Sequence, residues 1–187
     1  MMQQHPRISP YKEEQMPINN LSVVIQAGGK SSRMGTDKGL VEFRGVPLIK
    51  FILDQINRFG QETMIVTNDP GKYLKFGIPV YCDVLPNMGS LGGIYSALFH
   101  SSYENILILA CDMPFLDLNF FTSLVEYLPN YDAVVPFQTK KKFAEPFRSI
   151  YTKRTLPIIE QMLINDELKI NDLFSKIKTK YVDISTL

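Results

Sequence analysis

Short apolar runs rich in β-branched residues alternate along the chain with segments whose apolar residues repeat at helical spacing. A strand followed by a helix and another strand favours a right-handed crossover, and therefore a mainly parallel sheet with helices on both faces. We predict an α/β fold, a Rossmann-like three-layer sandwich. The expected strands lie at 21–25, 64–67, 79–82, 106–110, 132–137, 147–151 and 181–184, and the expected helices at 47–59, 94–100, 118–128, 155–164 and 171–176.

Glycines mark two of the expected element ends. Gly60 follows the last apolar residue of the first helical segment, and we expect it to cap the C-terminus of that helix. The stretch from Gly89 to Gly93 holds three glycines and is expected to form a turn before the helix at 94–100.

Length and charge restrict the classes of protein that this chain can represent. The 187 residues suit one domain; we assign 1–20, which are polar and contain three prolines, to a disordered leader and 21–187 to the domain. A net charge of +1 provides no basic field to recruit nucleic acid or a membrane surface. No apolar run approaches the ~20 residues of a membrane span. Two cysteines are too few for a disulfide framework and fit a reducing cytoplasm, where we expect the protein to act.

The loop after the first expected strand is the most informative motif. Residues 26–38 read Gln-Ala-Gly-Gly-Lys-Ser-Ser-Arg-Met-Gly-Thr-Asp-Lys, which is neither the dinucleotide fingerprint nor a P-loop. Its glycines let backbone N–H groups approach an anion closely. Arg33 can grip phosphate oxygens as a fork, and Lys38 can act as a point charge. The loop therefore favours phosphate binding, with a solvated strand-to-helix turn as the alternative.

Polar residues follow the later strands at their carboxyl ends, where ligands bind in sheets of this kind. Asp112 comes directly after the most apolar run in the chain, 106–110, and a carboxylate there is a natural magnesium ligand. The alternative for Asp112 is a turn or N-cap residue before Pro114. Asp83 and Asn68 follow earlier strands. Taken alone, Asp83 is equally consistent with an ordinary surface loop, whereas the Asn-Asp-Pro-Gly stretch that begins at Asn68 favours a simple turn.

Three of these motifs resemble those of the molybdenum cofactor guanylyltransferases. The loop at 26–38 is similar to their Leu-Ala-Gly-Gly-x-Ser-x-Arg-Met-Gly-x-Asp-Lys, with Gln26 in place of Leu, where the family uses mainly the backbone. Residues 111–115 resemble their Asp-x-Pro segment. Asp83 followed by 89–93 resembles an Asp and a later Gly-Pro-Leu-x-Gly, with Ser90 in place of Pro. The resemblance extends from about Leu21 to Ile184.

The resemblance implies a nucleotide-diphospho-sugar transferase-like fold and a magnesium-dependent enzyme. Such an enzyme transfers GMP from GTP to the phosphate of molybdopterin and releases pyrophosphate. Asp112 would hold the metal, and Arg33, Lys38 and Asp112 would act on the phosphates. Glu145 to Tyr151 would border the acceptor, to which the basic run 140–142 could contribute. The residues implied to bind the nucleotide are Gln26, Ala27, Gly28, Gly29, Lys38, Asn68, Asp83 and Asp112.

Other functions remain open at this level. A molybdopterin cytidylyltransferase or a sugar-1-phosphate nucleotidyltransferase would share the fold, and a nucleotide- or pterin-binding carrier would share the binding loop without catalysis. Guanylyltransferases usually carry an Asn-x-Asn-Thr-Pro segment near the metal and acceptor. This sequence reaches Leu187 without it, so Asp112 is the one metal ligand assigned. Transient contact with molybdenum-cofactor proteins is expected; binding to nucleic acid or a membrane is not.

Overall fold

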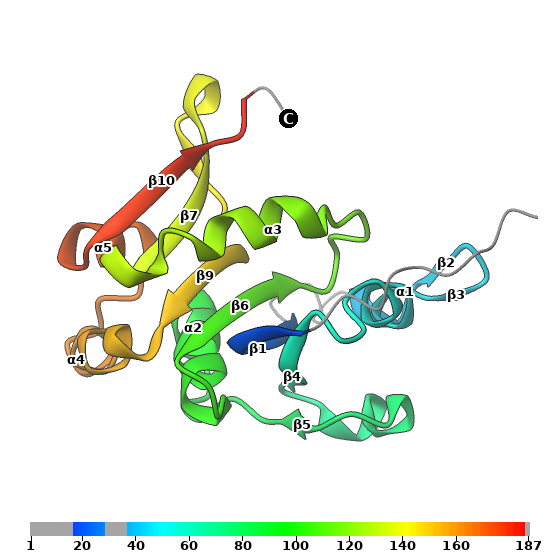
Figure 1. Cartoon of the computed structure of the whole chain (residues 1–187). Coiled ribbons are helices and arrows are strands. Elements are labelled where there is room, and N and C mark those ends of the chain that lie inside the picture. Colours follow the sequence, from blue (N-terminus) through cyan, green and yellow to red (C-terminus); the bar gives the residue numbers. More distant parts are fainter. Residues whose placement is uncertain (1–16, 29–36, 186–187) are drawn as a thin grey trace, which may run out of the picture.

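A mainly parallel, eight-stranded sheet forms the centre of the protein (Figure 1). The computed structural model describes residues 17–28 and 37–185. The strands of this sheet are β1 (Ile18–Ala27), β4 (Gly60–Thr67), β5 (Val80–Tyr81), β6 (Asn105–Ala110), β7 (Ala133–Gln138), β8 (Phe143–Ala144), β9 (Arg148–Thr152) and β10 (Thr179–Asp183). Their order is β10-β7-β9-β6-β1-β4-β5, with β8 paired to β7. A separate hairpin joins β2 (Glu42–Phe43) to β3 (Val46–Pro47).

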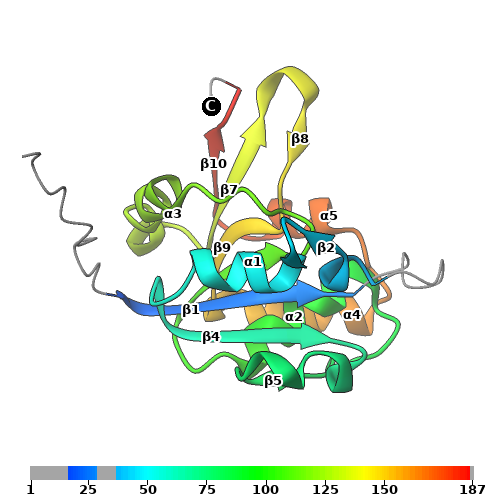
Figure 2. The same ribbon diagram turned by 90° about the vertical axis from the view of Figure 1, so that its right-hand side faces the viewer.

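Helices cover both faces of the sheet, as the alternation of elements predicts (Figure 2). The helices are α1 (Leu48–Gln55), α2 (Gly89–His100), α3 (Leu118–Val125), α4 (Leu156–Ile164) and α5 (Ile170–Lys176). Apolar side chains of α1 and α3 pack on one face. Those of α2, α4 and α5 pack on the other. The predicted three-layer α/β sandwich is confirmed.

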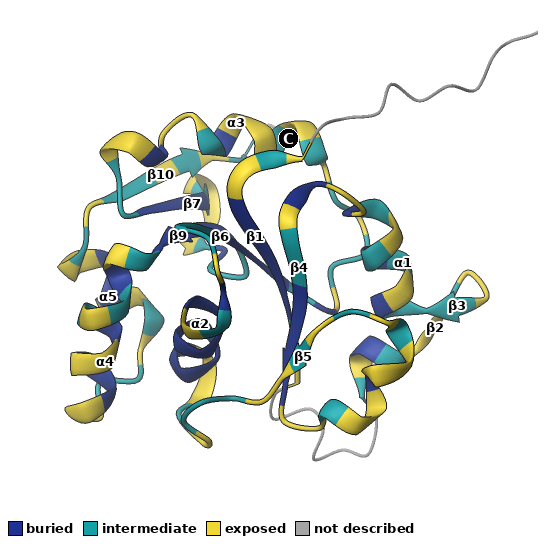
Figure 3. Ribbon diagram, turned by 60° about the horizontal axis from the view of Figure 1, so that its bottom comes forward, coloured by how far each residue is buried: buried dark blue, intermediate teal, exposed yellow. Residues whose placement is uncertain are grey.

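The central strands are buried from both sides (Figure 3). In β1, Val23 and Ile25 face the α1 and α3 layer, whereas Val24 faces the α2 layer, since successive side chains of a strand point to opposite faces. All three are fully buried. Burial on both faces explains why residues 23–25 of β1 and 106–110 of β6 are continuous apolar runs rather than alternating ones.

Parallel pairing brings the carboxyl ends of four strands to one edge. β1 pairs in parallel with β4 on one side and with β6 on the other, and β5 extends the sheet beyond β4. The register places Gln26 opposite both Val66 and Ala110. The loops that follow β1, β4, β5 and β6 therefore emerge together. β9 runs antiparallel between β6 and β7, while β10 is parallel to β7.

Some element bounds differ from those expected. β1 begins at Ile18 rather than Leu21, because the backbone N–H of Ile18 donates to the Phe59 carbonyl and the Asn20 side chain accepts from Glu104 N. Residues 18–20, which we assigned to the leader, are thus part of the sheet, and 1–16 lie outside the described residues. α3 also ends earlier than expected, at Val125. No helix in the described part of the chain is long and apolar enough to span a membrane.

Gly60 does not cap α1 as expected; it is the first residue of β4. A Cβ atom on Gly60 would lie 2.8 Å from the Leu21 carbonyl oxygen and 2.9 Å from Val23 Cγ2. Both distances are too short for a real Cβ atom. Glycine is therefore required at position 60 because β1 passes close to it, and not because the chain turns there.

We predict that Gly60→Ala destabilises the fold by about 1–3 kcal/mol, the usual cost of overpacking a well-packed core. Gly71→Ala is the matched control, because the nearest heavy atom to its added Cβ, Asp69 Oδ1, would be 3.9 Å away. Its free energy of unfolding should change by less than about 0.5 kcal/mol. Urea denaturation of the two variants measures the difference; equal stabilities would contradict the close approach of β1.

Candidate active site

A cavity opens at the carboxyl edge of the sheet. Its volume is about 950 Å³. Loops that follow β1, β4, β5 and β6 each contribute to its lining, as does the first turn of α2. Most of the expected site residues meet there: Gln26, Gly28, Lys38, Asn68, Asp83 and Asp112.

The other expected site residues lie elsewhere. Ala27 is fully buried and packs in the core beneath the cavity, so only its backbone is available to a ligand. Gly29 and Arg33 lie outside the described residues. Gly28 has φ +139°, a conformation that residues with a side chain rarely adopt, so glycine is required where the loop leaves β1.

Lys38 and Asp112 form an ion pair at the mouth of the cavity. Lys38 Nζ donates to Asp112 Oδ2 at 2.9 Å, and the two side chains are 53% and 41% exposed. This hydrogen bond, together with the charge of Asp112, raises the pKa of Lys38, which therefore stays cationic. Exposed ion pairs add little to stability, so both groups can exchange partners at low cost when a charged ligand arrives.

Of the two alternative roles considered for Asp112, the structure supports the turn and excludes the helix cap: Asp112 lies in a turn in which Met113 N donates to the Ala110 carbonyl at 3.3 Å. The N-cap of α3 is Asp117, whose side chain accepts from Phe120 N at 3.1 Å. The N-cap is therefore a different residue, and Asp112, two positions after the end of β6, lines the cavity. Its neighbour Cys111 is buried, and burial raises the pKa of that thiol to about 11. Cys111 is therefore neutral near pH 7 and is no nucleophile.

The side chain of Gln26 also reaches the cavity, although we expected this position to act mainly through its backbone. Gln26 Nε2 lies 3.5 Å from Asp83 Oδ1, and Gln26 Oε1 is buried without a hydrogen-bond partner. Gly93 makes room for this amide, because a Cβ atom there would lie 2.8 Å from Gln26 Nε2. Gln26 and Asp83 thus place hydrogen-bonding groups side by side at the cavity.

The glycine-rich stretch at 89–93 is the first turn of α2 rather than a turn before it. Met88 is the N-cap and makes no side-chain capping hydrogen bond. The first N–H groups of a helix lack partners within the helix and carry partial positive charge. Gly89 and Ser90 line the cavity, so this end of α2 offers donors to an anionic or carbonyl-bearing ligand.

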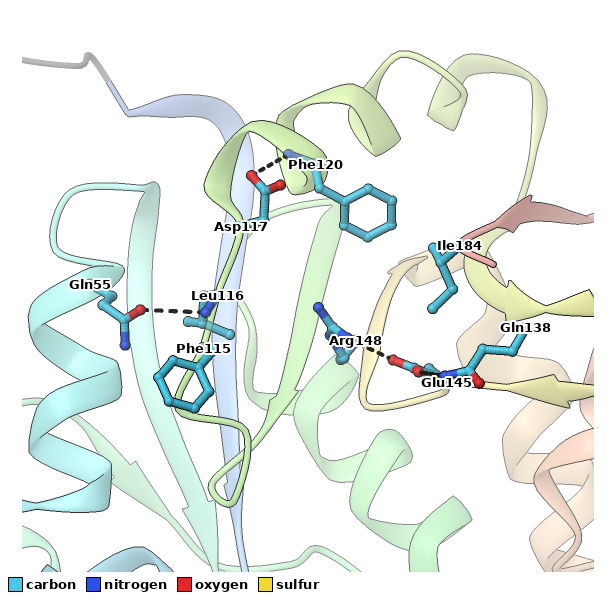
Figure 4. A pocket seen from close by; sticks show the side chains of 9 residues that line it. All are labelled: Gln55, Phe115, Leu116, Asp117, Phe120, Gln138, Glu145, Arg148 and Ile184. Carbon is cyan, nitrogen blue, oxygen red and sulfur yellow. Dashed lines mark hydrogen bonds and ion pairs between the residues drawn. The ribbon is translucent and has the colours of Figure 1, made fainter. Parts of the chain in front are cut away.

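A second cavity of about 460 Å³ is lined by residues of the β6–α3 connection, α3 and the segment from β7 to β9 (Figure 4). Phe115 and Phe120 supply apolar surface to it. Glu145, which is only 8% exposed, accepts from Arg148 Nη1 at 3.0 Å and from Gln138 Nε2 at 2.9 Å. Phe147 lines the first cavity, and the next residue in the chain, Arg148, lines the second.

The remaining expected acceptor residues divide between core and surface. Tyr151 is fully buried and donates to the Pro146 carbonyl at 3.0 Å, so it is a core residue that supports the segment 145–148. The basic run 140–142 is exposed at the β7–β8 hairpin and lines neither cavity. The suggestion that it holds the acceptor therefore gains no support from its position.

The sequence is similar to that of known proteins over most of its length. The profile of the family described as "MobA-like NTP transferase domain" matches residues 23–179. A "probable molybdenum cofactor guanylyltransferase" of Carboxydothermus hydrogenoformans is 35% identical over 170 residues, covering 91% of this chain and 85% of that protein. A protein of the same description from Flavobacterium johnsoniae is 36% identical over 169 residues, covering 89% and 87%.

Solved structures share the fold. Molybdopterin-guanine dinucleotide biosynthesis protein A from Archaeoglobus fulgidus has a TM-score of 0.74 and 24% identity, covering 89% of this chain and 85% of that one. A 4-diphosphocytidyl-2C-methyl-D-erythritol synthase from Anaerococcus prevotii has a TM-score of 0.64 and 18% identity, covering 89% and 88%. The predicted nucleotide-diphospho-sugar transferase-like fold is confirmed by these neighbours.

The mainly parallel sheet, with a glycine, a lysine and a carboxylate at its carboxyl edge, and the family profile together assign the chain to the nucleotidyltransferases. The matches in sequence narrow this class. The chain belongs to the family of MobA-like NTP transferases.

We predict that Gly93→Ala weakens nucleotide binding, because its methyl group would displace the Gln26 amide from Asp83. The loss should be roughly 5- to 10-fold in the dissociation constant, equivalent to about one hydrogen bond. In a Gln26→Ala background the same methyl group meets no amide and should add little further loss. Calorimetric titration of the three variants tests this coupling; additive losses would show that Gly93 acts independently of Gln26.

Proposed function

We propose that this enzyme transfers GMP from GTP to the phosphate of molybdopterin, forming molybdopterin guanine dinucleotide and releasing pyrophosphate. The observation that carries the proposal is that Lys38 and Asp112 form an ion pair at the cavity that Gly28 also lines. All three residues belong to the motifs that resemble those of the guanylyltransferases. The names of the relatives from Carboxydothermus and Flavobacterium support the same reaction.

The arrangement of the first cavity suggests how GTP binds. The triphosphate would lie over Gly28 and beside Lys38, with Gly29 and Arg33 contributing from the same loop. The base would lie toward Gln26, Asp83 and Asn68. Carboxylate and amide oxygens there can accept from the N1–H and exocyclic amine of guanine, which are both donors. The backbone of Ala27 would complete the contact.

Magnesium fits the proposed site through a single carboxylate. The described residues contain no group of three or more His, Cys, Asp or Glu side chains that could hold a metal. Magnesium commonly binds through one or two carboxylates together with substrate phosphates, so Asp112 alone meets that requirement. The ion would supply charge neutralisation at the α-phosphate. Asp112 would exchange its Lys38 partner for it.

The chain itself needs to supply positioning and charge rather than a nucleophile. The attacking phosphate monoester of the acceptor is already anionic near pH 7, so no general base is required. Its oxygen attacks the α-phosphorus in line while the bond to pyrophosphate breaks. Lys38, cationic and 2.9 Å from Asp112, would neutralise charge on the departing pyrophosphate. The neutral Cys111 thiol plays no covalent part.

The second cavity is the proposed acceptor side. Consecutive residues, Phe147 and Arg148, line the first and the second cavity, and a molecule held in the second would present its phosphate toward the α-phosphorus. The aromatic surface of Phe115 and Phe120 suits a planar ring system. Glu145 and Arg148 offer an acceptor and donors to the edge of such a ring.

The alternatives predict different products. A cytidylyltransferase would use CTP, a sugar-1-phosphate nucleotidyltransferase would use a sugar phosphate, and a carrier would bind nucleotide without releasing pyrophosphate. We retain as predictions that the enzyme acts in the cytoplasm, hands its product to molybdenum-cofactor proteins by transient contact, and binds neither nucleic acid nor a membrane.

Base selectivity tests the proposed reaction. With equal GTP, CTP and molybdopterin, we predict GMP incorporation over CMP by at least ~100-fold, since a wrong base leaves buried polar groups unpaired. Mass spectrometry of the product measures the ratio. A product that contains mainly CMP would exclude guanylyl transfer. The unmodified enzyme is the appropriate material, because Gly28→Ala would strain the loop backbone as well as alter the site.

We predict that Asp112→Ala lowers kcat by on the order of 100- to 1000-fold or more while the fold is retained, because a charge partner of the transition state is lost. Asp54→Ala is the matched control, since Asp54 is also an exposed carboxylate paired with a lysine, Lys50, but on α1. Turnover at limiting magnesium, with circular dichroism of both variants, decides the matter. Near-normal turnover of folded Asp112→Ala would refute the metal assignment.

A further inference from the structure

Asp37 anchors the short turn that carries Lys38. Its carboxylate caps the 3₁₀ turn η2 (Lys38–Leu40), because Asp37 Oδ1 accepts from Gly39 N at 3.2 Å. The same oxygen accepts from the hydroxyl of Tyr73 at 2.5 Å. The residue next to Lys38 is therefore tied to a distant part of the chain.

Tyr73 belongs to the connection between β4 and β5, where it lies between η3 (Pro70–Lys72) and η4 (Leu74–Phe76). Its side chain is fully buried in the core under α1, and its ring lies 6.1 Å from that of Phe76. Burial and the neighbouring Asp37 carboxylate raise the pKa of Tyr73, so its hydroxyl remains protonated and donates. Tyr73 does not line the cavity and is fixed by packing.

Gly39 allows this hydroxyl to reach Asp37. A Cβ atom on Gly39 would lie 2.8 Å from the Tyr73 hydroxyl oxygen and 3.4 Å from Cys111 Cβ. Gly39 is buried and its φ is not positive, so the requirement for glycine here is close packing rather than backbone conformation. A side chain at position 39 would thus prevent the Tyr73 hydroxyl from reaching the Asp37 carboxylate that caps the turn.

We propose that Tyr73 is a positioning residue for the transfer reaction: through Asp37 it holds the backbone of the turn so that the Lys38 ammonium faces Asp112 and the triphosphate. This inference rests on the proposed role of Lys38. A lysine has a long flexible side chain and is 53% exposed here, so its reach is controlled mainly by where its backbone is held. Small misplacements of a charged group that neutralises the transition state are costly.

The test compares Tyr73→Phe, Lys38→Ala and the double variant. Tyr73→Phe keeps the buried ring and removes only the oxygen that donates to Asp37. We expect Tyr73→Phe to lower kcat/KM for GTP by roughly 5- to 20-fold and Lys38→Ala by roughly 10- to 100-fold. The KM for the acceptor should not change in Tyr73→Phe. The double variant should match Lys38→Ala within about 2-fold, because the hydroxyl acts through Lys38.

Two further variants control for packing. Tyr95→Phe removes a comparable phenol–carboxylate hydrogen bond, to Glu160 at 3.3 Å on the opposite face, and should leave kinetics unchanged. Gly39→Ala displaces the Tyr73 hydroxyl by a second route. It should reproduce the loss in kcat/KM for GTP, and it provides the test if Tyr73→Phe does not fold.

The outcomes separate the two claims. If Lys38→Ala retained full activity, the proposed role of Lys38 would be wrong. If Lys38→Ala were impaired while Tyr73→Phe and Gly39→Ala were not, only the positioning role of Tyr73 would be overturned. The positioning role would also be overturned if the fold-losses in kcat/KM for GTP of the two single variants multiplied in the double variant. The same holds if Tyr73→Phe raised the KM for the acceptor as much as it lowered kcat/KM for GTP, since either result shows that Tyr73 acts on the whole core.

Discussion

The parallel pairing of β1 with both of its neighbours is the constraint on which the site depends. β1 is bonded to β4 and to β6, and its register places Gln26 opposite Val66 and Ala110. Because all three strands run the same way, the residues that follow them emerge at one edge. Neither face of β1 is exposed in its central part, so a shift of its register would expose apolar residues and displace every loop of the site.

The charged groups brought to that edge contribute little to the stability of the fold and are available to interact with a charged ligand. Lys38 and Asp112 are each about half exposed, and an exposed ion pair is worth ~0–1 kcal/mol. Beneath them, the buried Tyr73 hydroxyl, Gly39 and Cys111 form a close-packed base. The protein thus combines exchangeable charges above with a rigid support below, which is what a reaction driven by positioning and electrostatics needs.

The sequence predicts the layers and most of the site because both depend on local patterns. Apolar periodicity identifies the strands and helices, and the motifs at 26–38 and 111–115 identify the edge where Lys38 and Asp112 meet. What it misses depends on contacts between distant segments. Gly60 looks like a helix cap, but the near approach of β1 requires it.

Tyr73 was missed for the same reason. In the sequence it is one aromatic residue near a turn, and only the fold brings its hydroxyl to Asp37, 36 positions away. The Gln26 side chain is similar, since its position opposite Gly93 depends on how α2 packs on β1. Local signals identify the groups that touch a ligand, whereas the residues that hold those groups in place are recognised from tertiary packing.

Nucleotidyl transfer itself is the central claim, and pyrophosphate release measures it most directly. The enzyme should be incubated with GTP and magnesium, with and without molybdopterin, and pyrophosphate compared with the dinucleotide formed. Our account predicts equimolar pyrophosphate and dinucleotide, formed only when the acceptor is present. Tight binding of GTP with no pyrophosphate released under either condition would contradict it and leave a nucleotide-binding carrier or a nucleotidyltransferase for another acceptor.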